Sequence, residues 1–119
     1  MTAVNLAAKF ARIDEYWHPH IVGALNGQLV KVARLLGEFD WHFHEHEDEL
    51  FLVVRGTLFM QLRDREVRIG EGEFFIVPRG VEHRPVAPSE VHVVLFEPAS
   101  TLNTGNVNSE KTRRALEWI

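Results

Sequence analysis

The sequence predicts an all-β domain, built as an antiparallel sandwich or barrel, and two observations support this prediction. Five short runs are apolar or alternate apolar with polar residues, which is typical of β-strands. They span residues 28–36, 49–54, 57–62, 74–77 and 91–96. Turn-forming residues separate them, as in Asn26-Gly27, Gly70-Glu71-Gly72 and Pro78-Arg79-Gly80. Because no long helical pattern lies between the runs, a parallel sheet with crossover helices is not expected.

Short helical segments are expected only near the two ends of the chain. Leu6, Phe10 and Ile13 are spaced four and three apart, which predicts an amphipathic helix over residues 5–13. A second short helix is expected within residues 109–119. We therefore expect a single domain over residues 1–119, with a barrel core of about 28–97, an N-terminal extension of 1–27 and a C-terminal tail of 98–119.

Composition excludes several classes of function. The chain has 119 residues, enough for one independent core, and its net charge of −4 predicts no basic surface for nucleic acid. It has no cysteine, which excludes disulfides, thiolate metal sites and cysteine nucleophiles. No segment has the length of apolar sequence that a membrane-spanning helix or a secretion signal needs. We expect a cytoplasmic protein that binds neither nucleic acid nor membrane.

Three histidines at alternate positions, His42, His44 and His46, stand in an acidic stretch before an apolar run. In an extended segment, residues two apart point to the same face, so the imidazoles of His42 and His44 can converge on one metal ion. Glu49 opens the apolar run, where a buried carboxylate needs a partner or a metal. A triad of His42, His44 and His46 is the alternative, although the turn before Glu49 favours a solvated His46.

The residues around these histidines resemble the two sequence motifs of the cupin superfamily. The first motif is Gly37, His42-Phe43-His44, Glu49 and Gly56, and the second is Gly72, Pro78-Arg79-Gly80 and His83. Two departures from the usual pattern occur: four rather than five residues separate Gly37 from His42, and Ala87 stands where many cupins carry asparagine. All four ligand positions of the family are nevertheless filled.

The resemblance implies a small double-stranded β-helix, or jelly-roll, barrel of the single-domain kind often grouped with mannose-6-phosphate isomerase-like cupins. It also implies a divalent metal ion bound by His42, His44, Glu49 and His83. Three imidazoles and one carboxylate suit iron, manganese, nickel, copper or zinc, and they leave two positions of an octahedral ion for a ligand.

Two functions from different classes fit this site. The first is a metal-dependent enzyme, an isomerase or a dioxygenase, acting on a small polar oxygenated molecule such as a sugar derivative, an enediol, or an oxo or hydroxy acid. The second is a noncatalytic barrel that binds a small ligand or a metal. The sequence identifies no catalytic residue beyond the metal ligands, so both hypotheses stay open.

Several other residues receive a structural interpretation. Arg79 and Arg84 lie near His83 in sequence and could meet an anionic substrate, but a solvated loop is favoured. The remaining histidines are interpreted as structural or surface residues: His18, His20 and His92. Core positions are predicted for Phe51, Phe59, Met60, Phe74 and Phe75.

A homodimer is expected from the N-terminal extension. Residues 13–25 include Tyr16, Trp17, Ile21, Val22 and Leu25, more apolar surface than a lone extension should expose to water. Small cupins also commonly pair through their sheets.

Overall fold

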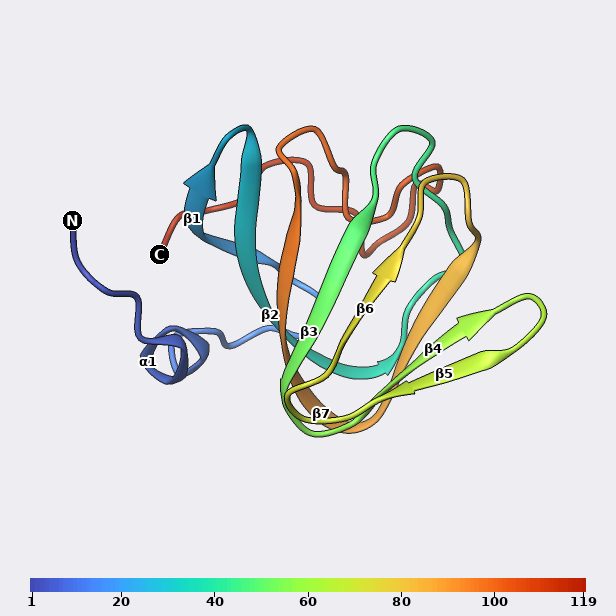
Figure 1. Ribbon diagram of the computed structural model, residues 1–119, viewed down its shortest axis with the longest axis horizontal. Coiled ribbons are helices and arrows are strands. Elements are labelled where there is room, and N and C mark those ends of the chain that lie inside the picture. The colour runs from blue at the N-terminus through green and yellow to red at the C-terminus, as the bar shows by residue number, and fades with distance from the viewer.

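Seven antiparallel strands form the protein, which is described by a computed structural model over residues 1–119 (Figure 1). The elements in chain order are α1 (Leu6–Phe10), β1 (His20–Leu25), β2 (Gln28–Glu38), β3 (Glu49–Arg55), β4 (Leu58–Leu62), β5 (Glu66–Ile69), β6 (Phe74–Val77) and β7 (His83–Pro98). The strand order is β1-β2-β7-β3-β6, and β4 pairs with both β5 and β7. This arrangement confirms the predicted all-β jelly-roll barrel.

The long strand β7 connects the two parts of the barrel. Its second half lies between β2 and β3, with Val93 paired to Ala33 on one side and to Val53 on the other. Its first half pairs with β4, where Val86 lies opposite Phe59. The sequence pattern predicts a turn over residues 85–88, but this stretch continues β7: Pro85 lies opposite Met60 of β4, and Pro88 falls where the pairing of β7 with β2 shifts register. As a result, His83 and the apolar run 91–96 belong to one strand.

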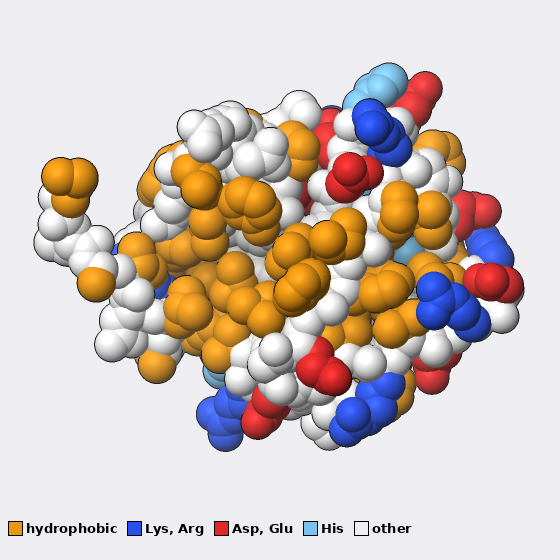
Figure 2. All heavy atoms as spheres, viewed as in Figure 1, with side chains coloured by type: hydrophobic (Ala, Val, Ile, Leu, Met, Phe, Trp, Pro, Cys, Tyr) orange, Lys and Arg blue, Asp and Glu red, His pale blue; other side chains and the backbone are white.

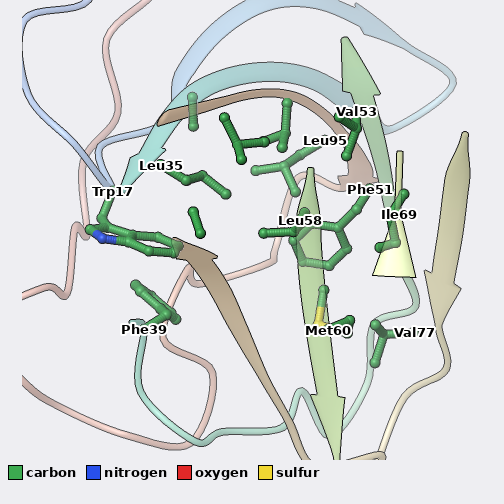
Figure 3. Packing of buried hydrophobic residues seen from close by; sticks show 14 residues of the cluster. Trp17, Leu35, Phe39, Phe51, Val53, Leu58, Met60, Ile69, Val77 and Leu95 are labelled. Carbon is green, nitrogen blue, oxygen red and sulfur yellow. The ribbon is translucent and has the colours of Figure 1, made fainter. Parts of the chain in front are cut away.

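The barrel interior is filled by inward-facing side chains from alternate strand positions (Figure 3). The cluster consists of Trp17, Ala33, Leu35, Phe39, Phe51, Val53, Leu58, Met60, Ile69, Val77, Ala87, Val91, Val93 and Leu95. Phe51 and Met60 confirm their predicted core positions, and Phe59 and Phe75 are partly buried. Phe74 was expected in the core but is 61% exposed, because it faces outward from β6 with the parity opposite to that of buried Val77.

The N-terminal extension packs against the outer face of the sheet. Phe10 and Ile13 form a second cluster with Val22, Val32 and Val94. Trp17 and Ile21 are also buried, so most of the apolar surface of residues 13–25 is covered within the chain itself. Tyr16 and Leu25 remain exposed, at 39% and 48%, so this segment supplies less apolar surface for a dimer than the sequence pattern suggests. The helix α1 has five residues, and no helix of the protein is long and apolar enough to cross a bilayer.

The C-terminal end contains no helix, contrary to the prediction for residues 109–119. The tail instead bonds to Ile21 of β1: the N–H of Ile21 donates to the carbonyl of Glu117 and the N–H of Ile119 donates to the carbonyl of Ile21, with N to O distances of 2.8 and 3.0 Å. Because β1 is the edge strand of the sheet, the tail satisfies backbone groups there that a helix could not reach. Sequence periodicity also missed β1 and β5 as strands.

Candidate metal centre

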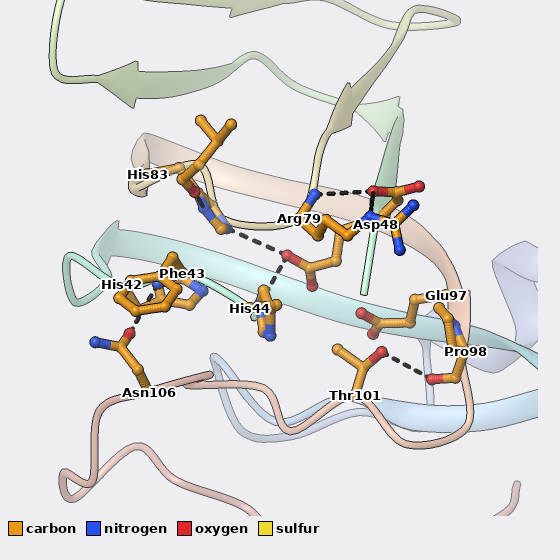
Figure 4. A network of polar contacts seen from close by, with 12 residues as sticks. His42, Phe43, His44, Asp48, Arg79, His83, Glu97, Pro98, Thr101 and Asn106 are labelled. Atoms are coloured by element: carbon orange, nitrogen blue, oxygen red, sulfur yellow. Dashed lines mark hydrogen bonds and ion pairs between the residues drawn. The ribbon is translucent and has the colours of Figure 1, made fainter. Parts of the chain in front are cut away.

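Four buried side chains from separate parts of the chain meet at one end of the barrel (Figure 4). His42 and His44 follow β2, Glu49 is the first residue of β3, and His83 is the first residue of β7. One nitrogen or oxygen atom from each of the four lies within 4.8 Å of the corresponding atoms of the others. None of the four is more than 4% exposed. The structure thus gathers the sequence-predicted set into one group that could hold a metal ion.

Backbone carbonyls orient two of the imidazoles. The Nδ1 atom of His42 lies 2.8 Å from the carbonyl oxygen of Asp40, and that of His83 lies 2.9 Å from the carbonyl oxygen of Val81. A carbonyl only accepts hydrogen bonds, so each Nδ1 carries the proton and each Nε2 keeps its lone pair. A metal-binding histidine has this same arrangement, in which one ring nitrogen is held by a hydrogen bond and the other is free to coordinate.

His44 supports a metal ion most directly. Its side chain is only 2% exposed, and neither of its ring nitrogens makes a hydrogen bond. The Nε2 atom lies 3.0 Å from Oε1 of Glu49, but the geometry is not that of a hydrogen bond. A buried polar nitrogen without a partner is costly. A cation between His44, Glu49 and His83 would satisfy it, and the nitrogen and oxygen donors present suit a divalent transition metal.

The charge states of the group also favour a cation. Burial, with a contribution from His83, lowers the pKa of His42 to about 4, so this imidazole is neutral at pH 7. Burial alone would raise the pKa of Glu49, but the adjacent imidazoles of His44 and His83 outweigh it and hold that pKa well below its usual range. Glu49 is therefore ionised at pH 7. A neutral imidazole and an ionised carboxylate are the forms that bind metal.

A cavity of about 40 Å³ lies beside this group inside the barrel. His42 and Glu49 line it from the metal side, and Trp17, Phe39 and Phe51 supply apolar walls. Since one water needs about 10–15 Å³ of such space, the cavity accommodates a few water molecules or a small ligand.

Sequence reasoning missed Glu97 and Lys31, two buried charged residues next to the site. Lys31 is 1% and Glu97 2% exposed, and Nζ of Lys31 lies 3.1 Å from Oε1 of Glu97. Burial and the adjacent Glu49 carboxylate raise the pKa of Glu97 well above its usual value, while Lys31 opposes this shift. The alternation along β7 could have predicted that Glu97 faces inward, because it continues the inward-facing series of Val93 and Leu95.

The other candidate residues lie outside the group. The side chain of His46 is 80% exposed, so the alternative triad with His42 and His44 does not form. Arg79 faces solvent beside Asp48, and Arg84 bonds to Gln61 and Glu38, while neither arginine lines the cavity. The remaining histidines lie elsewhere: His18 stacks on His20, and His92 stacks on Phe10.

Comparison with known families agrees with this geometry. Residues 33–97, more than half of the chain, match the family described as Cupin_2, the cupin domain. The chain is a cupin. The match begins in β2 and ends in β7, so it contains all four residues of the candidate metal centre.

Solved structures and curated proteins include relatives that are similar to this cupin in fold and sequence. A cupin-2 domain protein from Shewanella frigidimarina NCIMB 400 is 36% identical, with a TM-score of 0.79 over 80% of this chain and 93% of that one. YdbB of Bacillus subtilis (strain 168) is 32% identical over 67% of this chain and 72% of its own length. The 3-hydroxyanthranilate 3,4-dioxygenase of Xenopus laevis is 28% identical over 80% of this cupin, which covers 36% of that enzyme.

Proposed function

We propose that this cupin is a metal-dependent enzyme whose divalent ion is bound by His42, His44, Glu49 and His83. The observation that supports the proposal best is the convergence of these four buried side chains, with their donor atoms within 4.8 Å of one another. Iron, manganese, nickel, copper and zinc all suit three imidazoles and a carboxylate. The substrate is a small polar oxygenated molecule, such as a sugar derivative, an enediol, or an oxo or hydroxy acid.

The metal ion, the backbone carbonyls and the apolar walls would have different roles at such a site. When bound, a divalent ion supplies Lewis acidity to ligand oxygens, and iron adds the capacity to react with dioxygen. The carbonyls of Asp40 and Val81 hold the imidazoles of His42 and His83 in place. The apolar walls, including Phe39 and Phe51, exclude water and strengthen every polar contact made inside the cavity.

A screen of metal-loaded protein tests the enzymatic proposal. Fe(II)-, Mn(II)- and Zn(II)-loaded samples are incubated with enediols, oxo acids, hydroxy acids and sugar derivatives, while dioxygen uptake and aldose–ketose exchange are followed in parallel. Oxygen uptake that requires iron indicates a dioxygenase, a class for which the dioxygenase relative offers support. Exchange without oxygen indicates an isomerase. Absence of turnover with every metal overturns the enzymatic proposal.

A noncatalytic barrel that binds a small ligand or a metal is the second candidate. The residues that line the cavity favour this second function, because they include no serine, threonine, cysteine or tyrosine that could act as a nucleophile or an acid. Glu97 and Asn103 are the only polar lining residues besides His42 and Glu49. Tight ligand binding without turnover in the same screen supports this second function.

We also propose that the cupin is a homodimer, formed through the outer face and free edge of β6 rather than through residues 13–25. Phe74 is 61% and Ile76 48% exposed, and both lie beside the outward-facing Leu50 and Leu52 of β3. Figure 2 shows apolar side chains gathered on this side of the molecule. Strand β6 has a hydrogen-bonded neighbour on one side only. A second copy, placed by two-fold symmetry, would cover both the apolar face and the open edge.

A further inference from the structure

The charged pair Lys31–Glu97 stands out because it is buried at an interior position of the barrel. The register of β3 and β7, with Leu50 opposite Phe96, brings Glu97 next to Glu49, and both carboxylates face inward. Two buried carboxylates side by side repel each other, and exchanging a buried ion pair for apolar residues is often neutral or stabilising. Packing and stability alone therefore do not account for Glu97 at this position.

One oxygen of Glu97 has no partner. Lys31 occupies Oε1 at 3.1 Å, whereas Oε2 is buried and makes no hydrogen bond within the protein. Glu97 lines the same cavity as His42 and Glu49, and Figure 4 shows its carboxyl group turned toward His44. Lys31 holds the carboxyl group of Glu97 at the cavity wall. Its unpaired Oε2 can therefore accept a hydrogen bond from a molecule bound in the cavity.

We propose that Glu97 is a specificity-determining residue whose Oε2 accepts a hydrogen bond from a hydroxyl group of the ligand. Lys31 is the positioning residue that fixes the carboxyl group. This inference rests on the proposed function, because the ligand is held at the same time by the metal ion on His42, His44, Glu49 and His83. The ligand class is accordingly a small molecule with a pair of chelating oxygens and one further hydroxyl group.

The formal charges of the site narrow this class to monoanions. With a divalent ion on its four ligands, the charge of the ion exceeds that of the Glu49 carboxylate by one. A ligand carboxylate would balance the excess in a water-poor cavity. A short hydroxy acid with a second hydroxyl group supplies the chelating oxygens, the further hydroxyl group and the negative charge. It is also small enough for the cavity.

Glycerate and lactate of the same configuration form a matched pair of probes. Both present a carboxylate and a 2-hydroxyl group to the metal, and only glycerate has the additional 3-hydroxyl group. Co(II)-loaded protein is titrated with each acid by calorimetry, and the cobalt absorption spectrum reports whether each one coordinates. We expect glycerate to bind roughly tenfold more tightly than lactate to the wild-type protein, since a hydrogen bond to a charged group is worth about that factor.

The variants must separate ligand recognition from folding. Glu97→Leu alone would leave Lys31 buried without a partner, so the informative variant is the double substitution Lys31→Met/Glu97→Leu, which removes both charges. It should lose the preference for glycerate while keeping its affinity for lactate and for Co(II). The matched control is Arg34→Met/Glu90→Leu, which removes an ion pair between the same two strands but outside the cavity, and it should keep the preference.

Equal affinities of the wild-type protein for the two acids overturn the inference, as does a preference that survives in Lys31→Met/Glu97→Leu. Metal-loaded protein that binds neither acid overturns the role of Glu97 and leaves the metal site standing. Protein that takes up no Co(II) overturns the proposed function and this inference with it. The metal and ligand measurements therefore distinguish the two failures.

Discussion

His42 and His83 form a reciprocal pair of backbone hydrogen bonds, although 40 residues separate them in the sequence. The N–H of His42 donates to the carbonyl of His83 at 3.1 Å, and the N–H of His83 donates to that of His42 at 2.9 Å. Gly80 adds a third link, because its N–H donates to the carbonyl of His44 at 2.8 Å. The two ligand-bearing segments are thus joined by the backbone itself, independently of any ion.

This backbone connection predicts that removal of metal leaves the fold intact. Protein stripped with a chelator should keep its β-type circular dichroism spectrum but unfold at a lower temperature, because a metal that binds only the native state stabilises it by mass action. At a free metal concentration 100 times the dissociation constant, the gain is about 2.7 kcal/mol. Thermal unfolding with and without chelator at pH 7.5 measures this gain in stability. Identical unfolding midpoints would contradict a bound ion.

Metal content should depend on the four buried ligands and not on the nearby exposed histidine. Wild-type protein purified without a chelating tag should contain about one divalent ion per chain by plasma mass spectrometry. His44→Ala or His83→Ala should remove most of it. His46→Ala is the matched control and should retain the ion, because its side chain is 80% exposed. Full occupancy in the double variant His44→Ala/His83→Ala would refute the assignment.

Stability of the metal-free protein should fall on acidification. The pKa of His42 is about 4 in the folded protein and 6.5 in the unfolded chain, so the unfolded state binds more protons between these values. Stability is therefore fully present above pH 6.5 and is lost as the pH falls toward 4, by about 3 kcal/mol for this group. The depressed pKa of Glu49 acts in the same direction below pH 4.5.

Denaturant unfolding of chelator-stripped protein at pH 7.5 and 4.5 measures this pH dependence. The variant His42→Gln should show a smaller difference between the two pH values. A free energy of unfolding that is constant or rises on acidification would contradict the buried, neutral state of His42.

Gly105 should be required for the geometry around His44. An added Cβ would lie 2.2 Å from the carbonyl oxygen of Phe43 and 3.2 Å from Nδ1 of His44, and the backbone φ is +55°. Gly105→Ala should destabilise the protein by about 2–3 kcal/mol and weaken metal binding. Gly72→Ala is the control, because φ of Gly72 is also positive, at +79°, but an added Cβ there has no atom within 4 Å. This variant should lose only about 1 kcal/mol of unfolding free energy. Calorimetric unfolding and metal titration compare the two, and equal losses would contradict a role of Gly105 at the site.

The oligomeric state should depend on the exposed face of β6. Light scattering of the wild-type protein at tens of micromolar should give a dimer mass, and Phe74→Lys/Ile76→Lys should give a monomer, because charges there cannot be buried in an interface. Leu25→Lys changes a residue of similar exposure on β1, at the opposite end of the strand order, and should remain dimeric. A monomeric wild-type protein would refute the proposed dimer.

The sequence by itself determined the fold class and the four candidate ligands, because both are expressed in short-range patterns. Strand alternation depends on the period of two residues, and His42, His44 and Glu49 lie within eight residues of one another. His83 came from the resemblance of its surroundings to a second cupin motif. Each of these signals is local, so each could be recognised without knowing how the chain packs.

The tertiary structure decided what depends on contacts between distant segments. The C-terminal tail extends along β1 instead of forming a helix, because an open strand edge offers backbone partners that local propensity does not register. Phe74 is exposed although it is strongly apolar, since its exposure is set by which face of β6 meets the core. Lys31 and Glu97 lie 66 positions apart, and only the pairing of β2 with β7 brings their charges together beside the metal ligands.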